Sequence, residues 1–319
     1  MKLNCVAGLL LAAIVSASPF VSRGQPTCKN LKADANNGGR KIGIVIDSSG
    51  SMYDTDPYNL RILAGQQIND WLVTSKEASG SRKEDLVTVV DFDDVATLLY
   101  PLGDPSGAGD TFKLIDSMGG TFIAAGVDMA TTELTKGGHD PTSNRSGIVV
   151  LTDGSDSDTA TLIDSINKCG QLGIRVSFGF LAYDASYQDP EVLTAILGTG
   201  GMYATIDGAT AQNSFVNLMI VHGLTGKDNP SPSSATTLVN GLSIASVMDS
   251  SGSNTLTYTA EAKEKLTFSI TSVNAGDLTA TANDANGKTL GTTTISSYGY
   301  SEDLVVTAVS DGDLQLKIS

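Results

Sequence analysis

The sequence predicts an α/β domain with a doubly wound, mostly parallel sheet, followed by a small antiparallel β-sandwich. Two patterns along the chain lead to this prediction. From Arg40 to about Gly226, nearly continuous apolar runs alternate with segments of helical apolar spacing, which is typical of a sheet covered by helices on both faces. Beyond residue 236 the runs are short and alternate apolar with polar residues, as antiparallel strands with one solvated face do. With 319 residues, 40% of them hydrophobic, the chain can form two cores.

The first domain, residues 40–226, has its expected elements in alternating order. We expect strands at 41–46, 86–90, 96–100, 148–151, 174–181 and 202–206, and helices at 59–73, 122–134, 159–172, 191–197 and 211–222. Only a short acidic segment divides the second strand from the third, so these two strands are expected to form a hairpin. The other strands are each followed by a helix, which predicts parallel neighbours.

The second domain, residues 237–319, follows a linker at 227–236 that contains two prolines. Its alternating runs predict strands at 256–259, 266–270, 278–281, 304–307 and 314–318. The dipeptides Asn286-Gly287 and Asp311-Gly312 are turn sequences between such runs. About 85 residues with this pattern predict a small antiparallel β-sandwich.

The N-terminus has the pattern of an export signal. Lys2 precedes an apolar stretch that ends in small residues near Ala17, so we expect residues 1–17 to be a signal peptide and 18–39 an N-terminal segment. The stretch is too short for a membrane span; a buried N-terminal helix is the alternative. We therefore expect the mature protein to be secreted, extracellular and without a membrane span.

The charge balance excludes one class of partner. The chain has 35 acidic and 20 basic residues, a formal net charge of −15. Its densest basic runs, such as Arg40-Lys41, are two residues long, so nucleic-acid binding is not expected. An acidic excess is compatible with cation binding.

Two covalent features are predicted for an oxidising compartment. Cys28 and Cys169 remain after signal removal, and we expect them to form a disulfide, with two buried thiols as the alternative. Cys28 precedes the first strand and Cys169 ends the helix after a neighbouring strand, so both are expected at the same edge of the sheet. Asn144 begins an N-glycosylation sequon.

Hydroxyl and carboxylate residues occur where three expected elements meet one edge of the sheet. One carboxylate and two hydroxyls alternate on the turn after the first strand, one threonine follows two glycines before a helix, and one aspartate closes a buried strand. Ligands bind at the carboxyl edge of open α/β sheets, and such hard oxygens suit Mg²⁺, Mn²⁺ or Ca²⁺ rather than Zn²⁺. Taken singly, each is an ordinary turn or cap residue. The expected metal-site residues are Asp47, Ser49, Ser51, Thr121 and Asp153.

The order of these segments resembles the metal-ion-dependent adhesion site (MIDAS) of von Willebrand factor type A domains. The segments are Asp47-x-Ser49-x-Ser51, Gly119-Gly120-Thr121 and Thr152-Asp153-Gly154. The resemblance covers roughly residues 40–226, matches all five positions and implies a Rossmann-like fold. It implies that Ser49 and Ser51 bind the metal directly and Thr121 directly or through water. Asp47 and Asp153 would act largely through water and hydrogen bonds, which leaves an open position for an acidic group of a partner.

Other acidic residues near these segments have simpler expected roles. Asp54 and Asp56 are separated by Thr55, so solvated loop acids are favoured over the second calcium site found beside the MIDAS of some integrin β subunits. Asp156 and Asp158 are expected to cap the helix that begins at residue 159, with calcium binding as the alternative.

No catalytic motif is present in the sequence. The two histidines form no zinc-peptidase motif, and no nucleophile elbow or phosphate-binding loop occurs. We therefore expect no enzymatic activity and favour cation-dependent binding of an extracellular protein that presents a carboxylate.

The alternative is a hydrolase-associated or wall-polysaccharide-binding protein whose type A domain is a scaffold. Its sandwich distantly resembles domains that follow type A domains in chloride-channel regulators or that are appended to secreted peptidases. Sugar recognition would need an aromatic strip, for which the candidates are Tyr258, Phe268, Tyr298 and Tyr300.

Overall fold

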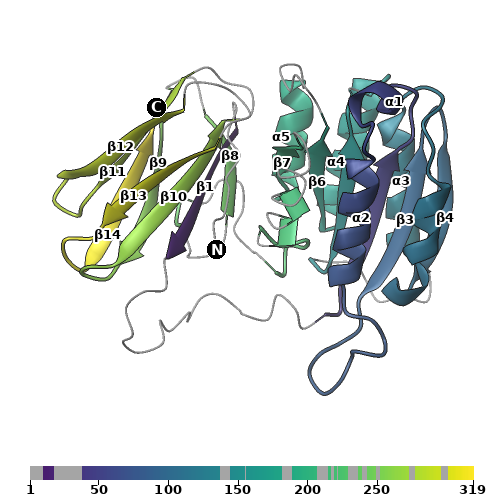
Figure 1. The fold of residues 1–319 in the computed structure, drawn as a ribbon, viewed down its shortest axis with the longest axis horizontal. Helices are drawn as coiled ribbons and strands as arrows, with labels where there is room; N and C mark the ends of the chain where they lie inside the picture. The colour runs from purple at the N-terminus through teal and green to yellow at the C-terminus, as the bar shows by residue number, and fades with distance from the viewer. Residues whose placement is uncertain are drawn as a thin grey trace. The chain divides into compact units, whose positions relative to one another are not determined.

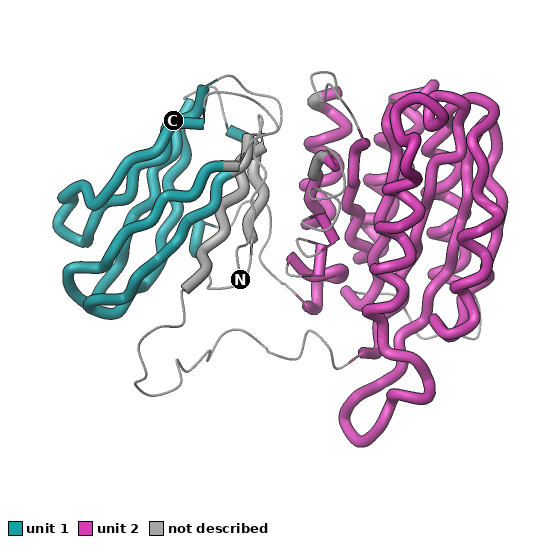
Figure 2. The backbone as a smooth tube through the Cα atoms, viewed as in Figure 1, with its two compact units in different colours: residues 1–33, 231–319 teal, residues 34–230 magenta. Residues whose placement is uncertain are grey.

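The structure is a computed structural model of the whole chain, and it divides into two compact units. The units are residues 34–230 and residues 1–33 with 231–319 (Figure 2). It describes residues 10–17, 38–136, 144–154, 156–181, 189–206, 215–216, 219–220, 222–228, 236–238, 243–248, 252–272, 277–295 and 301–319.

The unit of residues 34–230 contains a six-stranded sheet in the order β4-β3-β2-β5-β6-β7 (Figure 1). All neighbours are parallel except β3 and β4, which form the expected hairpin. The α/β fold class predicted from the sequence is confirmed. The strands are β2 (Lys41–Asp47), β3 (Leu86–Phe92), β4 (Ala96–Gly103), β5 (Ser146–Thr152), β6 (Ile174–Phe180) and β7 (Tyr203–Thr205).

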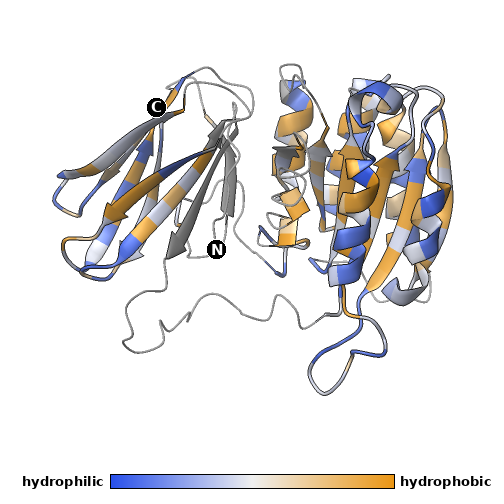
Figure 3. Cartoon of the chain, viewed as in Figure 1, coloured by the Kyte–Doolittle hydropathy of each residue, from blue (hydrophilic) through white to orange (hydrophobic). Residues whose placement is uncertain are grey.

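Helices cover both faces of this sheet. They are α1 (Met52–Thr55), α2 (Leu60–Trp71), α3 (Ile123–Leu134), α4 (Thr159–Gln171) and α5 (Pro190–Gly198), with 3-10 helices at Pro105–Gly107 and Gly109–Leu114. Of the helix expected at 211–222, the described residues 215–216, 219–220 and 222 are helical. Figure 3 shows strongly hydrophobic strands between these helices.

Two glycines set the approach of helices α2 and α3 to opposite faces of β2. A Cβ at Gly65 of α2 would lie 2.8 Å from Ile46 Cδ1, and one at Gly126 of α3 would lie 2.7 Å from Val45 Cγ1. Successive strand residues point to opposite faces, so Ile46 and Val45 mark the two faces. Both helices therefore pack closely on β2 and hold its carboxyl end in place.

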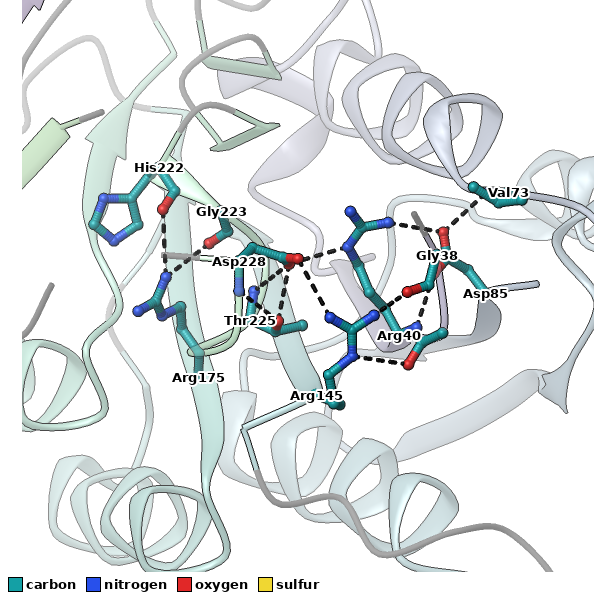
Figure 4. A network of polar contacts seen from close by, with 11 residues as sticks. Gly38, Arg40, Val73, Asp85, Arg145, Arg175, His222, Gly223, Thr225 and Asp228 are labelled. Atoms are coloured by element: carbon teal, nitrogen blue, oxygen red, sulfur yellow. Dashed lines mark hydrogen bonds and ion pairs between the residues drawn. The ribbon is translucent and has the colours of Figure 1, made fainter. Parts of the chain in front are cut away.

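A buried ionic network joins the start of β2 to the end of the unit (Figure 4). Arg40 Nη1 lies 3.0 Å from Asp85 Oδ2, and Arg40 Nε lies 3.0 Å from Asp228 Oδ2. Thr225 Oγ1 also donates to Asp228 Oδ2, at 2.8 Å. Asp228 belongs to the predicted linker, yet its side chain is buried. The network shows that the folded unit extends through this residue.

The second unit has two antiparallel four-stranded sheets, in the orders β13-β10-β1-β8 and β12-β11-β14-β9. All five predicted strands are confirmed. The strands are β1 (Leu10–Ala17), β8 (Ser243–Val247), β9 (Asn254–Ala260), β10 (Lys265–Ser272), β11 (Leu278–Asn283), β12 (Thr289–Ile295), β13 (Ser301–Thr307) and β14 (Gly312–Ile318). Strands β8 and β12 were not expected, and the four threonines and one glycine of β12 explain why its sequence lacked a clear apolar alternation.

The predicted signal peptide contributes strand β1 to this unit. Leu10–Ala17 pairs antiparallel with both β10 and β8. Its sequence is almost wholly apolar, whereas β9 and β14 alternate buried and more exposed residues. Cleavage after Ala17 stays a prediction, and it would remove this strand from the sheet. No helix among the described residues is long and apolar enough to cross a membrane.

The two covalent predictions also remain predictions. Cys169 is a free, fully buried thiol on α4, with its Sγ 3.1 Å from Thr131 Oγ1 on α3. Burial raises the pKa of this thiol to about 11. Its expected partner Cys28 lies outside the described residues. Asn144 is exposed in a turn, which is compatible with a glycan at its side chain.

Candidate metal centre

Asp47 is the last residue of β2, and its carboxylate is fully buried. The backbone of the following turn and a side chain of the neighbouring strand β5 hydrogen-bond to it. Its Oδ1 accepts a 2.7 Å hydrogen bond from the Ser49 backbone N–H, and its Oδ2 accepts a 2.5 Å bond from Thr152 Oγ1. Burial, with a smaller contribution from the nearby Asp153 carboxylate, raises the pKa of Asp47 to about 6, although hydrogen bonds from Ser49 and Thr152 oppose the rise. The folded chain therefore holds a poorly solvated carboxylate that a cation would stabilise.

The side-chain oxygens of three expected metal-site residues, Ser49, Ser51 and Asp153, form a continuous hydrogen-bonded row. Ser49 Oγ and Ser51 Oγ are 3.0 Å apart, and Ser51 Oγ lies 3.1 Å from Asp153 Oδ1. Adjacent oxygens around an octahedral Mg²⁺ ion, each about 2.1 Å from the metal, are about 2.9 Å apart. The spacing of this row is compatible with the oxygen ligands of a small divalent cation, and it is also that of the hydrogen bonds that join these groups.

Thr121 lies beside this row, on the loop before α3. The Gly50 N–H donates to the Gly119 carbonyl at 3.0 Å, which joins this loop to the serine turn. Gly119 has a positive φ of 85°, a conformation that glycine adopts without strain. A Cβ at Gly154 would lie 3.9 Å from Thr121 Cγ2. Hydrogen bonds join Asp47, Ser49, Ser51 and Asp153. The loop that carries Thr121 is placed beside them by its backbone hydrogen bond to Gly50 and by its closeness to Gly154.

Two further threonines hold the carboxylates of the site. Thr152 donates to Asp47, as described above, and Thr55 Oγ1 hydrogen-bonds to Asp153 Oδ2 and lies 2.9 Å from the Ser51 carbonyl oxygen. Sequence reasoning assigned no role to either hydroxyl. Thr152 could have been noticed because it precedes Asp153 on a buried strand, but the contact of Thr55 depends on the four-residue helix α1, which was not expected.

Arg61 is the main residue that the sequence did not reveal. Its side chain is fully buried on α2, where Nε donates to the Asp47 carbonyl oxygen at 2.6 Å. One terminal nitrogen, Nη1, pairs with Asp56 Oδ2 at 2.9 Å. The other, Nη2, donates to the Asp116 carbonyl oxygen at 2.8 Å and to Ser117 Oγ at 3.0 Å. One guanidinium thus joins the end of β2 to the loop that leads to Thr121.

The other acidic residues cap helices or face solvent. Asp54 is exposed, as expected. Asp56 was expected to be solvated, and this is wrong: it is buried, accepts the Leu60 N–H at 2.6 Å and pairs with Arg61. Asp158 caps α4 as predicted, by accepting from Thr161 N–H at 3.2 Å. Asp156 instead accepts the Ala124 N–H at 2.7 Å, so it caps the first turn of α3.

The chemistry of the donor set is that of a weak, oxygen-only site. Among the described residues, no three His, Cys, Asp or Glu side chains form a group that could hold a metal. A cation here would depend on hydroxyl oxygens together with Asp47 and Asp153. Such a set favours hard ions such as Mg²⁺, Mn²⁺ or Ca²⁺.

The other aromatic side chains are mainly structural. The Arg40 guanidinium lies 4.7 Å from the centroid of the Trp71 ring, a contact typical of a packed side chain. In the sandwich, Phe268 is fully buried, and Tyr258 is 8% exposed with its hydroxyl 2.8 Å from Glu264 Oε1. Tyr298 and Tyr300 lie outside the described residues. Two of the four aromatic residues considered for sugar binding therefore belong to the core.

Comparison with known proteins agrees with the observed fold of the first unit. Residues 42–155 match the family model of the von Willebrand factor type A domain. No curated protein shows a significant sequence match to the chain.

Three similar solved structures illustrate the likeness. The conserved hypothetical protein BatB from Bacteroides thetaiotaomicron is 21% identical, with 56% of this chain and 96% of that chain covered and a TM-score of 0.42. A von Willebrand factor type A protein from Catenulispora acidiphila is 14% identical, with 88% and 58% covered and a TM-score of 0.46. Proximal thread matrix protein 1 of the mussel byssus, in a structure with a zinc-occupied MIDAS motif, is 16% identical, with 58% and 47% covered and a TM-score of 0.45.

The matched segment contains all five expected site residues and the strands that position them. The parallel sheet, its covering helices and the family match together support a protein that carries a von Willebrand factor type A domain.

Proposed function

We propose that this protein is a secreted, non-enzymatic binding protein that captures a carboxylate of an extracellular protein partner through a divalent cation. The observation that carries the proposal is the row of oxygens from Ser49, Ser51 and Asp153 beside the buried Asp47. Domains of this family are adhesion or protein-interaction domains, which supports a binding role. The charged and apolar N-terminal pattern supports secretion.

Each residue of the site has a distinct part in this proposal. Ser49 and Ser51 would hold the cation through their hydroxyls, and Thr121 would do so directly or through water. Asp47 and Asp153 would accept hydrogen bonds from the ligating groups and from water. A bound cation supplies a strong electrostatic attraction for an acidic group, and this attraction persists because few carboxylates neutralise the ion.

The glycan-binding alternative has less support from the structure. Tyr258 and Phe268 are buried, so they offer no aromatic platform for a sugar. Binding to a glycan array that survives EDTA would nevertheless decide in its favour.

Substituting Thr121 with alanine should weaken partner binding with little effect on folding, because its side chain lies at the edge of the site. The test uses a displayed library of random dodecapeptides, selected on the immobilised protein in Mg²⁺ and eluted with EDTA. We expect the eluted peptides to contain Asp or Glu and to bind Thr121→Ala at least about tenfold more weakly at saturating Mg²⁺, the loss of roughly one ligand contact.

The matched control is Thr161→Ala, since Thr161 also lies near the start of a helix but its side chain hydrogen-bonds to Asp158 rather than to a residue of the candidate metal centre. Selected peptides that lack an acidic residue, or that stay bound in EDTA, would contradict the proposed function.

A further inference from the structure

The loops around the candidate metal centre carry one sign of charge. Segments 48–59, 91–96, 116–122 and 153–158 contain acidic residues but no Lys or Arg. They follow strands of the six-stranded sheet at its carboxyl edge or, for 116–122, hydrogen-bond to the serine turn there. Asp54, Asp94 and Asp116 are exposed on these loops. A partner that approaches the metal therefore meets a negative surface.

Large apolar side chains are exposed on the same loops. Tyr53 is 78% exposed, Tyr58 82% and Met118 65%. Tyr53 lies on α1, two residues after Ser51, and the Met118 N–H donates to the Ser48 carbonyl oxygen at 2.6 Å. Tyr53 and Met118 therefore lie on segments that adjoin the candidate metal centre, and Tyr58 follows five residues after Tyr53. Tyrosine and methionine are enriched in the buried cores of protein interfaces.

Charge and exposure together restrict the chemistry of the partner. A purely acidic segment would reach the metal only against repulsion from Asp54, Asp94 and Asp116. A segment with Lys or Arg beside its carboxylate would be attracted by these acids instead. The exposed rings of Tyr53 and Tyr58 can also accept a cationic side chain on their faces. Electrostatic complementarity thus favours a ligand that is basic overall.

We propose that the face formed by Tyr53, Asp54, Tyr58, Asp94, Asp116 and Met118 binds a basic polypeptide segment that contains one carboxylate. The carboxylate reaches the metal centre while the flanking Lys or Arg residues contact the acids and tyrosine rings. This inference rests on the proposed function and specifies its partner class. In this proposal the exposed residues of the loops select a basic partner, whereas the five metal-site residues hold the cation.

The dodecapeptide selection in Mg²⁺ separates this inference from the proposed function. We expect the EDTA-eluted peptides to combine one or two acidic residues with an excess of Lys and Arg, so that their net charge is positive. EDTA-eluted peptides that contain Asp or Glu but are neutral or negative overall would overturn the basic-partner inference and leave the proposed function intact. Failure of EDTA to elute any enriched peptide would contradict the proposed function itself.

Variants of the face test the contacts directly with one selected peptide at saturating Mg²⁺. Asp54→Asn combined with Asp94→Asn should lower its affinity by about five- to tenfold at low salt, and this effect should shrink at 0.5 M salt because exposed charges are screened. Glu302→Gln is the control, since it removes an exposed acid from the other unit. Equal affinities for the double variant and this control would overturn the role of the acidic residues.

The apolar part of the face has its own variant. Tyr53→Ser should weaken the same peptide by about tenfold without changing Mg²⁺ affinity, because Tyr53 is 78% exposed. Val309→Ser, at a residue that is 62% exposed in the other unit, is the control. Unchanged peptide binding by Tyr53→Ser would remove the tyrosine from the proposed surface.

Discussion

Replacing Arg61 with methionine should lower the free energy of unfolding by about 3–5 kcal/mol, the range for breaking a buried ion pair. Methionine retains much of the apolar volume but leaves buried Asp56 without its guanidinium partner. It also removes the donors to the carbonyl oxygens of Asp47 and Asp116. For a unit of this size the loss corresponds to a fall in melting temperature of roughly 10 °C, which calorimetry would measure.

A double variant provides the control for this prediction. Arg61→Met combined with Asp56→Asn should cost less than the sum of the two single changes, because the pair is coupled. Arg61→Lys should lie between the wild type and Arg61→Met, since an ammonium group can pair with Asp56 but cannot reach three elements at once. A loss below about 1 kcal/mol for Arg61→Met would show that the contacts of Arg61 contribute little to stability.

Replacing Asp47 with asparagine should stabilise the metal-free protein at pH 8 and abolish its stabilisation by Mg²⁺. The rise in the Asp47 pKa from 3.8 to about 6 corresponds to a penalty of at most about 3 kcal/mol for the ionised carboxylate. Asparagine avoids this penalty and can still accept the Ser49 N–H. Relative to the wild type, Asp47→Asn should therefore melt at a higher temperature in EDTA and gain no stability when Mg²⁺ is added. Melting curves in EDTA and in Mg²⁺ measure the two effects separately.

The pH dependence of this effect has a definite direction. Because the folded-state pKa of Asp47 is raised, its contribution to wild-type stability is most favourable below about pH 4 and is lost as the pH rises to about 6. The advantage of Asp47→Asn in EDTA should therefore be full above pH 6 and disappear toward pH 4. An advantage independent of pH would show that ionisation of Asp47 is not its cause. The control is Ser165→Ala, which changes a buried polar residue of α4 without changing any charge.

The sequence allowed prediction of the elements whose pattern is local. The apolar runs of β2, β5 and β6 are recognisable because both faces of these strands are buried. The same runs place Asp47 and Asp153 at one edge, and the structure brings both into the candidate centre. Strand β12 could not be predicted in this way because its threonines and glycine give no apolar periodicity.

The supporting contacts of the site depend on tertiary structure. Arg61 has the sequence position of an ordinary polar helix residue, and its burial becomes evident only when Asp47, Asp56 and Asp116 surround it. Asp56 follows a short helix that no sequence periodicity indicates. The contacts of Arg61 reach residues up to 56 positions away, and that of Thr152 with Asp47 spans 105 positions, so no short motif contains them.

Calorimetric titration of Mn²⁺ into EDTA-treated, dialysed protein measures whether the oxygen atoms around Asp47 bind a cation. We expect one site per chain in the wild type. We also expect a loss of at least about tenfold in affinity when Ser49 and Ser51 are both changed to alanine, because two ligands are removed. Affinity should also fall below about pH 6, where protons compete for Asp47. Absence of binding in the wild type, or equal affinity in the double alanine variant, would contradict the metal centre.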